Sequence, residues 1–372
     1  MKVLITGANG FIGRNLQVHL ATRKDIEVTL FTRDQSLDQL PSLVEQADFI
    51  FHLAGVNRPD DPQEFTSGNT DLTQALCKAI AKSDRSIPVL YTSSIQAERD
   101  NPYGISKKSA EQALLDLAEG SGCPVHIFRL PNVFGKWAKP NYNSAVATFC
   151  HNIVRGLPIQ INDPQATINL VYIDDVIDCF IALMDGRIEG QPFMEVSPVY
   201  KITVGDLSAQ LERFRDSRET LTTEAVGTGL TRALYSTYLS YMPPESFTYS
   251  VPKHGDQRGV FVEMLKTQDS GQFSFFTAHP GITRGGHYHH SKTEKFLVIK
   301  GNACFRFRHI VTGEFHELFT SGDEPVIVET VPGWTHDITN VGDSEMVVML
   351  WANEIFDRER PDTYAMPVGT KA

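Results

Sequence analysis

Tyr103 and Lys107 are four residues apart, at the start of a segment with helical periodicity. Side chains at this spacing share one face of a helix. An ammonium beside a phenol stabilises the phenolate and so lowers the pKa of the phenol, which is normally about 10. Ser94 follows a short β-rich run and could offer a hydroxyl hydrogen bond to the same substrate oxygen. The three residues predict a catalytic set in which Tyr103 donates a proton, although the pair alone would suit an ordinary helix surface.

A glycine-rich turn near the amino terminus supports this interpretation. Gly7, Gly10 and Gly13 follow a hydrophobic strand and precede a helix that we expect from Arg14 to Thr22. Such a turn can bring backbone N–H groups and a helix N-terminus against a pyrophosphate. Its Gly-x2-Gly-x2-Gly spacing differs from the Gly-x-Gly-x2-Gly of many dehydrogenases, and a purely structural turn is the alternative. We predict cofactor contacts at Gly7, Gly10, Phe11, Ile12, Gly13, Tyr103 and Lys107.

The end of the second strand bears on the choice of cofactor. An acidic side chain at this place binds the ribose 2′-hydroxyl of NAD, whereas a cation suits the 2′-phosphate of NADP. The strand ends Phe31-Thr32-Arg33, so NADPH is favoured. The nearby Asp34 leaves NADH as an alternative cofactor, and Arg33 could also be a solvated surface residue.

A second candidate set lies near the carboxyl terminus. His287 and His289 point to the same side of a predicted strand, because side chains alternate with a period of two. Glu294 and His336 could complete a shell of three histidines and one carboxylate. Such a shell suits Zn²⁺, the metal we expect, but also Fe²⁺, Mn²⁺ or Ni²⁺. His290 could compete as a ligand or act as a catalytic base, and a metal-free barrel that only binds sugar is the alternative.

Strands that alternate with helices must position the first set. The predicted strands are Val3–Thr6, Val28–Phe31, Phe49–His52, Val89–Thr92 and Val125–Phe128, with a helix over Ser106–Glu119 among the intervening segments. This alternation predicts an α/β fold with a doubly wound parallel sheet. We assign residues 1–243 to this domain, with a mixed substrate-capping lobe at its end.

The pattern of the sequence changes after Pro243-Pro244. Closely spaced strands bounded by glycine or proline follow, with almost no helical periodicity: Phe273–Phe276, Lys295–Ile299, Ala303–Phe307, Val326–Val328 and Met346–Leu350. Residues 247–372 are therefore predicted to form an all-β barrel.

Composition limits the class of protein. A chain of 372 residues with 41% hydrophobic and 21% charged residues fits two globular domains. Five scattered cysteines without a Cys-x-x-Cys pair argue against disulfides and favour a reducing cytoplasm. A strand directly after Met1 and the lack of about 18 consecutive apolar residues predict neither export nor a membrane span. A net charge of -11 disfavours nucleic acid as a partner but permits an anionic small substrate.

The first domain resembles the extended short-chain dehydrogenase/reductase family, which acts on nucleotide sugars. The motifs are Ile5-Thr-Gly-Ala-Asn-Gly-Phe-Ile-Gly13, His52-Leu-Ala-Gly55, Thr92-Ser-Ser94, Tyr103-x3-Lys107, Arg129-Leu-Pro-Asn-Val-Phe-Gly135 and Val171-Tyr-Ile-Asp-Asp175. The resemblance implies a Rossmann fold, with Leu53, Ala54 and Gly55 along the cofactor. It also implies that Asn132 faces the sugar diphosphate.

Two departures from this family narrow the reaction. Ser94 and Tyr103 are unusually close in sequence, so substrate contacts of the intervening loop cannot be carried over. Members that dehydrate sugars carry an Asp-Glu pair after the catalytic hydroxyl residue, and Ile95-Gln96 stands there instead. Reduction or epimerisation is therefore favoured over dehydration.

The second domain resembles the cupin family. Gly281-x5-His287-x-His289-x4-Glu294-x6-Gly301 matches its first motif, and Gly333-x2-His336-x3-Asn340 matches the core of the second. Pro332 departs from the second motif because it stands directly beside Gly333 rather than one residue earlier.

The order of the two domains is similar to that of the bifunctional enzymes of UDP-N-acetyl-L-fucosamine synthesis in bacterial capsule and O-antigen pathways. The resemblance implies a UDP-2-acetamido-2,6-dideoxy-hexos-4-ulose substrate, bound by Ser94, Asn132, Lys136 and Lys139. It implies epimerisation at carbon 3 in the cupin, followed by NADPH-dependent reduction at carbon 4 to UDP-N-acetyl-6-deoxy-L-talosamine. By the same analogy we expect a homodimer.

Three other functions are weighed against this one. A nucleotide-sugar 4-epimerase would return its hydride and show no net oxidation of NADPH, and its cupin would only bind sugar. An Fe²⁺ oxygenase in the cupin would consume oxygen. A non-catalytic sugar sensor would bind ligands without turnover, and the joint presence of Ser94, Tyr103 and Lys107 argues against it.

Overall fold

The computed structural model describes residues 1–59, 61, 63–256, 259–262, 264–267, 271–354, 357 and 359–370, and most of the remaining residues fall in the predicted barrel range 247–372. Contacts between Cα atoms divide the chain into two compact units. Unit 1 comprises Met1–Phe134, Asn141–Ser144 and Ile168–Ile202, and unit 2 comprises Gly135–Pro140, Ala145–Thr167 and Thr203–Ala372.

A six-stranded parallel sheet forms the centre of unit 1. Its strands are β1 (Lys2–Thr6), β2 (Glu27–Phe31), β3 (Phe49–His52), β4 (Val89–Ser94), β5 (Val125–Leu130) and β8 (Phe193–Met194). They are arranged in the order β2-β1-β3-β4-β5-β8, and every pair is parallel. The predicted doubly wound sheet is confirmed, since all five strands expected from the sequence are present.

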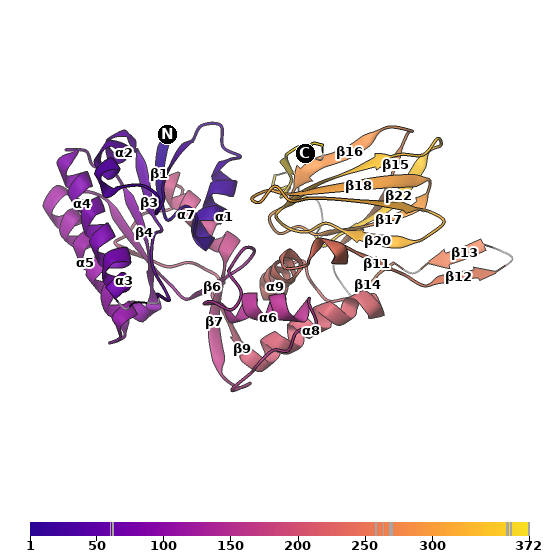
Figure 1. Ribbon diagram of the computed structural model, residues 1–372, viewed down its shortest axis with the longest axis horizontal. Helices are drawn as coiled ribbons and strands as arrows, with labels where there is room; N and C mark the ends of the chain where they lie inside the picture. The colour runs from indigo at the N-terminus through magenta and orange to yellow at the C-terminus, as the bar shows by residue number, and fades with distance from the viewer. Residues whose placement is uncertain are drawn as a thin grey trace. The chain divides into compact units, whose positions relative to one another are not determined.

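Helices cover both faces of this sheet (Figure 1). On one side α1 (Phe11–Leu20) packs against α7 (Ile173–Met184), and on the other α4 (Leu72–Lys82) packs against α2 (Leu40–Gln46) and α5 (Pro102–Ser121). The core beneath α2, α4 and α5 contains fully buried aliphatic residues of sheet and helices. Smaller elements of the chain here are η1 (Leu37–Gln39), α3 (Gln63–Phe65), η2 (Thr66–Asp71), η3 (Ile95–Glu98), and the sheet of β6 (Asn132–Phe134), β7 (Thr167–Tyr172) and β9 (Tyr200–Thr203).

Helix α5 starts earlier than predicted because its first turn is well capped. The Asn101 side chain accepts a hydrogen bond from the Gly104 N–H at 2.8 Å, and Pro102 occupies the first turn. Tyr103 therefore lies in the first turn and Lys107 one turn later, on the same helix face.

In its described residues, unit 2 combines three α-helices with two antiparallel five-stranded sheets. The helices are α6 (Ala145–Ile153), α8 (Val204–Thr220) and α9 (Gly229–Ser240). One sheet has the order β11 (Thr248–Ser250), β20 (Val326–Glu329), β17 (Glu294–Lys300), β22 (Met346–Ala352), β15 (Gln272–Ala278). The other has the order β19 (Phe315–Ser321), β18 (Asn302–His309), β21 (Trp334–Asn340), β16 (Thr283–Tyr288), β23 (Tyr364–Ala365). The predicted β fold of the carboxyl-terminal part is confirmed. Short pieces of the described chain belong to the same unit: β10 (Thr222–Thr223), η4 (Pro244–Ser246), β12 (Lys253–Asp256), β13 (Gly259–Val262) and β14 (Lys266–Thr267).

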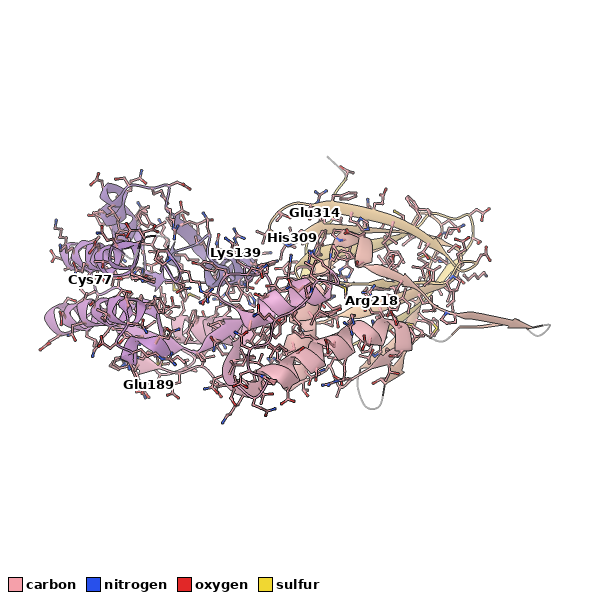
Figure 2. All side chains as sticks on the ribbon, turned by 60° about the horizontal axis from the view of Figure 1, so that its bottom comes forward. Cys77, Lys139, Glu189, Arg218, His309 and Glu314 are labelled. Carbon is pink, nitrogen blue, oxygen red and sulfur yellow. The ribbon has the colours of Figure 1, made fainter. Side chains whose placement is uncertain are left out.

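A buried ion network joins α8 to the strands of unit 2. Glu329 accepts hydrogen bonds from Arg218 on one carboxylate oxygen, at 2.5 Å, and from Lys295 on the other. Arg218 is labelled in Figure 2. Arg218 also donates to the Ser246 carbonyl at 2.6 Å, and Lys295 donates to the Tyr249 hydroxyl at 2.9 Å. Burial raises the pKa of Glu329, but the positive charges of Lys295 and Arg218 outweigh burial and hold it below its usual value. The carboxylate therefore stays charged and ties the helix to the barrel.

None of the helices in the described ranges is both long enough and apolar enough to cross a membrane.

Candidate functional site

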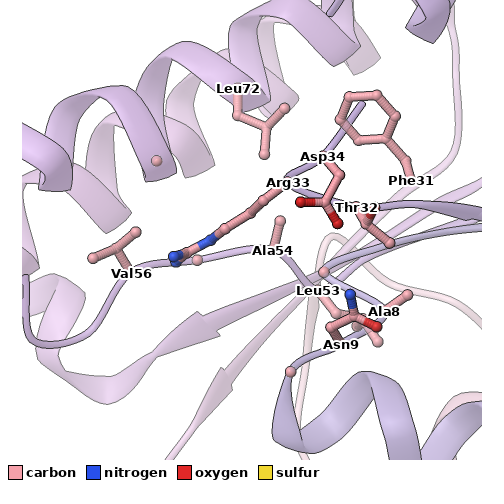
Figure 3. A pocket seen from close by; sticks show the side chains of 14 residues that line it. Ala8, Asn9, Phe31, Thr32, Arg33, Asp34, Leu53, Ala54, Val56 and Leu72 are labelled. Atoms are coloured by element: carbon pink, nitrogen blue, oxygen red, sulfur yellow. The ribbon is translucent and has the colours of Figure 1, made fainter. Parts of the chain in front are cut away.

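A cavity of about 520 Å³ opens in unit 1 at the carboxyl ends of β1, β2 and β3 (Figure 3). The strand order reverses at this place, because β2 and β3 flank β1 on opposite sides, and such switch points bind ligands in open α/β sheets. Its lining residues are Gly7, Ala8, Asn9, Gly10, Phe31, Thr32, Arg33, Asp34, Leu53, Ala54, Gly55, Val56, Gly68 and Leu72. Of the predicted cofactor residues, Gly7, Gly10, Arg33, Leu53, Ala54 and Gly55 line the cavity, whereas Phe11, Ile12, Gly13, Tyr103 and Lys107 do not.

The glycine turn is shaped by close backbone packing. Gly7 has a φ of +69°, and a Cβ on it would lie 2.5 Å from the Ala54 nitrogen. The turn closes through a 2.9 Å hydrogen bond from the Gly10 N–H to the Gly7 carbonyl. Only glycine fits where the turn passes this close to the end of β3, and the turn leads straight into α1.

Arg33 and Asp34 both line the cavity from the loop after β2. In Figure 3 the Arg33 side chain extends across the cavity toward Val56, and the Asp34 carboxylate lies nearer to Thr32. Both side chains are exposed. The cavity thus presents the cation that suits a 2′-phosphate together with the carboxylate that suits a 2′-hydroxyl.

A chain of hydrogen bonds fixes the end of β3. The Thr73 hydroxyl donates to the Asn69 carbonyl at 2.6 Å, so it accepts from His52 Nε2 at 2.8 Å. His52 Nδ1 then accepts from the Thr6 hydroxyl at 2.7 Å. Burial, together with the charge of Lys107, lowers the pKa of His52 to about 3, which keeps the imidazole neutral as this chain requires.

Asn69 extends the same support to α5. Its Oδ1 accepts from the Val56 N–H at 2.8 Å, and its Nδ2 donates to the Ser106 hydroxyl at 3.0 Å. A Cβ placed on Gly55 would lie 3.0 Å from Lys107 Nζ and 3.1 Å from Asn69 Oδ1. The cavity wall at Gly55 therefore lies directly against the Lys107 ammonium. Sequence reasoning missed Asn69, whose partners lie in other elements.

The structure brings Ser94 to Tyr103 but gives Lys107 other partners. The Ser94 side chain hydrogen-bonds to the Tyr103 phenol. Lys107 is only 4% exposed and donates to the Tyr91 hydroxyl at 3.2 Å and the Thr92 carbonyl at 2.9 Å. Burial lowers the pKa of Lys107 to about 8, while the nearby Glu111 carboxylate raises it.

The predicted lowering of the Tyr103 pKa is wrong for this structure. Burial raises the pKa of Tyr103 above its usual value, and the hydrogen bond from Ser94 only partly opposes this. The physical reason is that the phenol is largely removed from water while the Lys107 ammonium is bonded elsewhere. A phenol with a raised pKa still carries its proton at neutral pH, as a proton donor must.

Glu111 anchors the helix face that carries Lys107. Its side chain is 2% exposed and accepts a hydrogen bond from the Ser93 hydroxyl at 2.5 Å. Both of its carboxylate oxygens also accept hydrogen bonds from the Arg129 guanidinium. Ser93 precedes Ser94, so the same carboxylate connects the end of β4, the end of β5 and helix α5.

The predicted substrate residues fall into different units. Asn132 in unit 1 is exposed, and its amide donates to the Asn169 carbonyl at 3.2 Å. Lys136 and Lys139 belong to unit 2. Lys136 is fully buried with its Nζ 5.5 Å from the ring centroid of Trp137, and Lys139 is exposed.

In unit 2 the four predicted metal ligands converge. One ligand atom from each of His287, His289, Glu294 and His336 lies within 4.8 Å of the others. Glu294 Oε2 is 3.0 Å from His289 Nε2 and 3.4 Å from His336 Nε2. His287 on β16 stands opposite His336 on β21, and Glu294 begins β17.

A β-bulge in β16 aims the first of these ligands. The pairing with β21 shifts register between Gly285 and His287. Gly285 has a φ of +101°, and a Cβ there would lie 2.9 Å from the His336 carbonyl, so the bulge needs glycine.

The protonation states of this cluster suit a divalent cation. Burial, with the neighbouring His336 and His289, lowers the pKa of His287 to about 3, and burial also lowers the pKa of His336. Burial raises the pKa of Glu294, but its imidazole neighbours His289 and His336 outweigh this and hold it well below its usual value. Neutral imidazoles beside a carboxylate are what a metal ion binds.

His290 is placed apart from the four converging residues. It is buried, and its ring lies edge-on to Tyr364 at 4.7 Å and to Tyr288 at 5.5 Å between centroids. The following Ser291 is held by helix α9, since Ser236 donates to its carbonyl at 2.8 Å and Arg232 donates to its hydroxyl.

Residues 3–194 match the NAD dependent epimerase/dehydratase family, and residues 254–364 match the polysaccharide biosynthesis C-terminal domain. With the parallel sheet, the glycine turn and the cavity at the switch point, this shows that the chain belongs to the NAD dependent epimerase/dehydratase family. It is 67% identical, over the full length of both chains, to the UDP-2-acetamido-2,6-beta-L-arabino-hexul-4-ose reductase of Pseudomonas aeruginosa.

Solved structures give the same picture. The capsular polysaccharide assembling protein CapF from Staphylococcus aureus is 43% identical, with a TM-score of 0.68 over 99% of this chain and 100% of CapF. The UDP-glucuronic acid 4-epimerase from Bacillus cereus, solved with UDP-glucuronic acid and NAD, is 20% identical, with a TM-score of 0.53 over 58% of this chain and 83% of its own. The second likeness concerns the fold alone.

Proposed function

We propose that this chain is a bifunctional nucleotide-sugar enzyme. Its barrel inverts carbon 3 of a UDP-2-acetamido-2,6-dideoxy-4-hexulose, and its amino-terminal domain then reduces the carbon-4 ketone with NADPH to UDP-N-acetyl-6-deoxy-L-talosamine. The names of the Pseudomonas reductase and of CapF support this substrate class and a role in capsule assembly.

The observation that carries the reductase half is the placement of Ser94, Tyr103 and Lys107. Ser94 and Tyr103 share a hydrogen bond, and Lys107 lies directly behind Gly55 in the cavity wall. Tyr103 keeps its proton until the substrate oxygen becomes an alkoxide and then donates it, while the Ser94 hydroxyl hydrogen-bonds to the same oxygen. The ammonium of Lys107 lies on the same helix face, directly behind Gly55, where its positive charge would face the bound cofactor.

The cavity fits a dinucleotide cofactor. The turn at Gly7 passes so close to the end of β3 that any side chain there would collide with the Ala54 backbone, and α1 begins directly after the turn, so its N-terminus would face a pyrophosphate. NADPH supplies a hydride when bound there. Arg33 would hold the 2′-phosphate, and this cation is our reason to propose NADPH rather than NADH.

The cluster in the barrel fits a divalent metal, for which we propose Zn²⁺. His287, His289 and His336 would hold it through imidazole nitrogens and Glu294 through a carboxylate oxygen, a donor set common for zinc. Such an ion supplies Lewis acidity to a neighbouring carbonyl oxygen. The 4-keto group acidifies the proton on carbon 3, and His290 is the candidate base that removes it. Epimerisation precedes reduction, because reduction removes the ketone that makes this proton acidic.

The experiment is to incubate the protein with the 4-keto sugar nucleotide in D₂O, with and without NADPH, and to follow deuterium at carbon 3 and NADPH absorbance. We expect exchange without NADPH and net NADPH oxidation when it is added. Tyr103→Phe should lose about 10²- to 10⁴-fold in NADPH oxidation while exchange at carbon 3 persists. Tyr200→Phe, on β9, serves as the matched control.

Three outcomes would contradict the proposal. Full turnover by Tyr103→Phe would overturn the role of this residue. Conversion of the sugar without net NADPH oxidation would indicate a 4-epimerase. If the wild-type protein incorporated no deuterium at carbon 3, the proposed epimerisation in the barrel would be wrong.

A further inference from the structure

The loop between β16 and β17 carries His289 and is held by a carboxylate from near the carboxyl terminus. Asp362 Oδ1 accepts a hydrogen bond from the His290 N–H at 2.9 Å. Its Oδ2 accepts from the N–H groups of Ser291 at 2.9 Å and Lys292 at 2.7 Å, and from the Ser291 hydroxyl at 3.1 Å. One side chain therefore satisfies three successive backbone N–H groups, as a capping carboxylate does at a helix start.

The backbone of the same residue orients the imidazole of His289. The Asp362 carbonyl oxygen lies 2.5 Å from His289 Nδ1. A carbonyl can only accept, so Nδ1 must carry the proton and donate it. In the neutral imidazole this leaves Nε2 with a lone pair, which faces Glu294 Oε2 at 3.0 Å. The Nε2 lone pair and the Glu294 carboxylate oxygen lie so close together that a cation or a proton must stand between them. A metal ion bound at the cluster would supply this cation.

Asp362 can hold the loop because the chain around it is itself fixed. The next residues form β23, which pairs with β16 so that Ala365 stands opposite His287 and Tyr364 opposite Tyr288. Further on, Arg308 donates to the Val368 carbonyl at 2.6 Å. Asp362 has a φ of +38°, a left-handed conformation that Asp, Asn and Gly tolerate better than other residues do.

We infer that Asp362 is a positioning residue for the metal site: its carboxylate fixes the loop that follows His289, and its carbonyl sets the tautomer that presents Nε2 to the metal. This inference rests on the metal site of the proposed function. A partner that orients a ligand in this way typically changes metal affinity about 10- to 100-fold.

Two substitutions separate the carboxylate from the backbone. Asp362→Gly removes all carboxylate acceptors but keeps a residue suited to the positive φ. Asp362→Asn keeps one carbonyl oxygen and the same shape, so it provides the test if the glycine variant does not fold. Asp343→Asn, an exposed position between β21 and β22, is the matched control.

The measurements are Zn²⁺ and Co²⁺ affinity by competition with a chromophoric chelator, the visible spectrum of the Co²⁺ form, and thermal unfolding with and without metal. We expect about 10- to 100-fold weaker binding in Asp362→Gly, a smaller loss in Asp362→Asn and none in Asp343→Asn. The Co²⁺ spectrum should change and the metal-induced rise in unfolding temperature should shrink. A residue that only braced the fold would lower the unfolding temperature of the metal-free protein and leave affinity and spectrum intact.

The two possible failures are distinguishable. Wild-type affinity and spectrum in both Asp362 variants would overturn the positioning role while leaving the metal site. Failure of the wild-type protein to bind either metal would overturn the metal site of the proposed function and this inference with it.

Discussion

The buried ammonium of Lys107 makes the pH dependence of reduction a sharp test of the mechanism. Burial lowers its pKa from 10.5 to about 8, against the opposing charge of Glu111. This change corresponds to about 3 kcal/mol of extra cost for holding the charge inside the protein. Because the folded-state pKa is lowered, Lys107 is charged at neutral pH but loses its proton as the pH rises through about 8.

We expect kcat/KM for the NADPH-dependent reduction to be level up to about pH 8 and to fall about tenfold per pH unit above it, since this parameter reports groups of the free enzyme. Tyr103 does not account for this fall, because burial raises its pKa above the usual value. Lys107→Arg keeps the charge over the whole range, so the fall should disappear from its profile, at a lower plateau because a guanidinium does not match the contacts of an ammonium.

The assay follows NADPH absorbance at low substrate concentration between pH 6.5 and about 9.5, with Lys108→Arg as control because Lys108 is the exposed neighbour on the same helix. A wild-type profile that is flat through pH 9 would refute the reasoning, and so would an unchanged fall in Lys107→Arg.

Three further outcomes follow from the structure. Arg33→Ser should lower kcat/KM for NADPH about 10- to 100-fold and leave kcat/KM for NADH little changed, when the rate is measured with each cofactor. Equal losses with both cofactors would contradict a contact between Arg33 and the 2′-phosphate. Chelation of metal should lower the unfolding temperature followed by tryptophan fluorescence, because all three tryptophans lie in unit 2; no shift would contradict a bound ion. Glu329→Gln should destabilise unit 2 by about 3–5 kcal/mol in urea titrations, since it leaves Arg218 and Lys295 without their shared anion, and unchanged stability would contradict this.

Local signals in the sequence predicted much of the fold. Hydrophobic runs predicted all five strands from β1 to β5, and motif spacing predicted the four side chains that converge in the barrel. β21 was not predicted as a strand because most of its buried side chains are polar. His336 belongs to the converging cluster and Asp337 pairs with Arg306 at 2.8 Å, so no apolar run marks the strand.

Long-range contacts account for what the sequence could not show. Asp362 acts on a loop some 70 residues earlier in the chain, and Asn69 bonds to Ser106 across 37 residues. The partner of Lys107 is Tyr91 on a neighbouring strand, and this contact explains why the expected effect on Tyr103 is absent. The homodimer, the cytoplasmic location and the individual residue roles stay predictions.

The contacts of α8 and α9 limit how this chain can be divided or recombined. A fragment beginning at Pro243 would retain Glu329 but lose Arg218, and it would also lose Arg232 and Ser236, which hold the loop beyond His289. A barrel fragment that is to be exchanged between proteins would therefore have to start at or before residue 203, so that it includes both helices together with the strands that they contact. A gene fusion made at the Pro243-Pro244 junction would produce a barrel in which Glu329 keeps Lys295 but has lost the hydrogen bond from Arg218, and in which the loop beyond His289 has lost its contacts with α9.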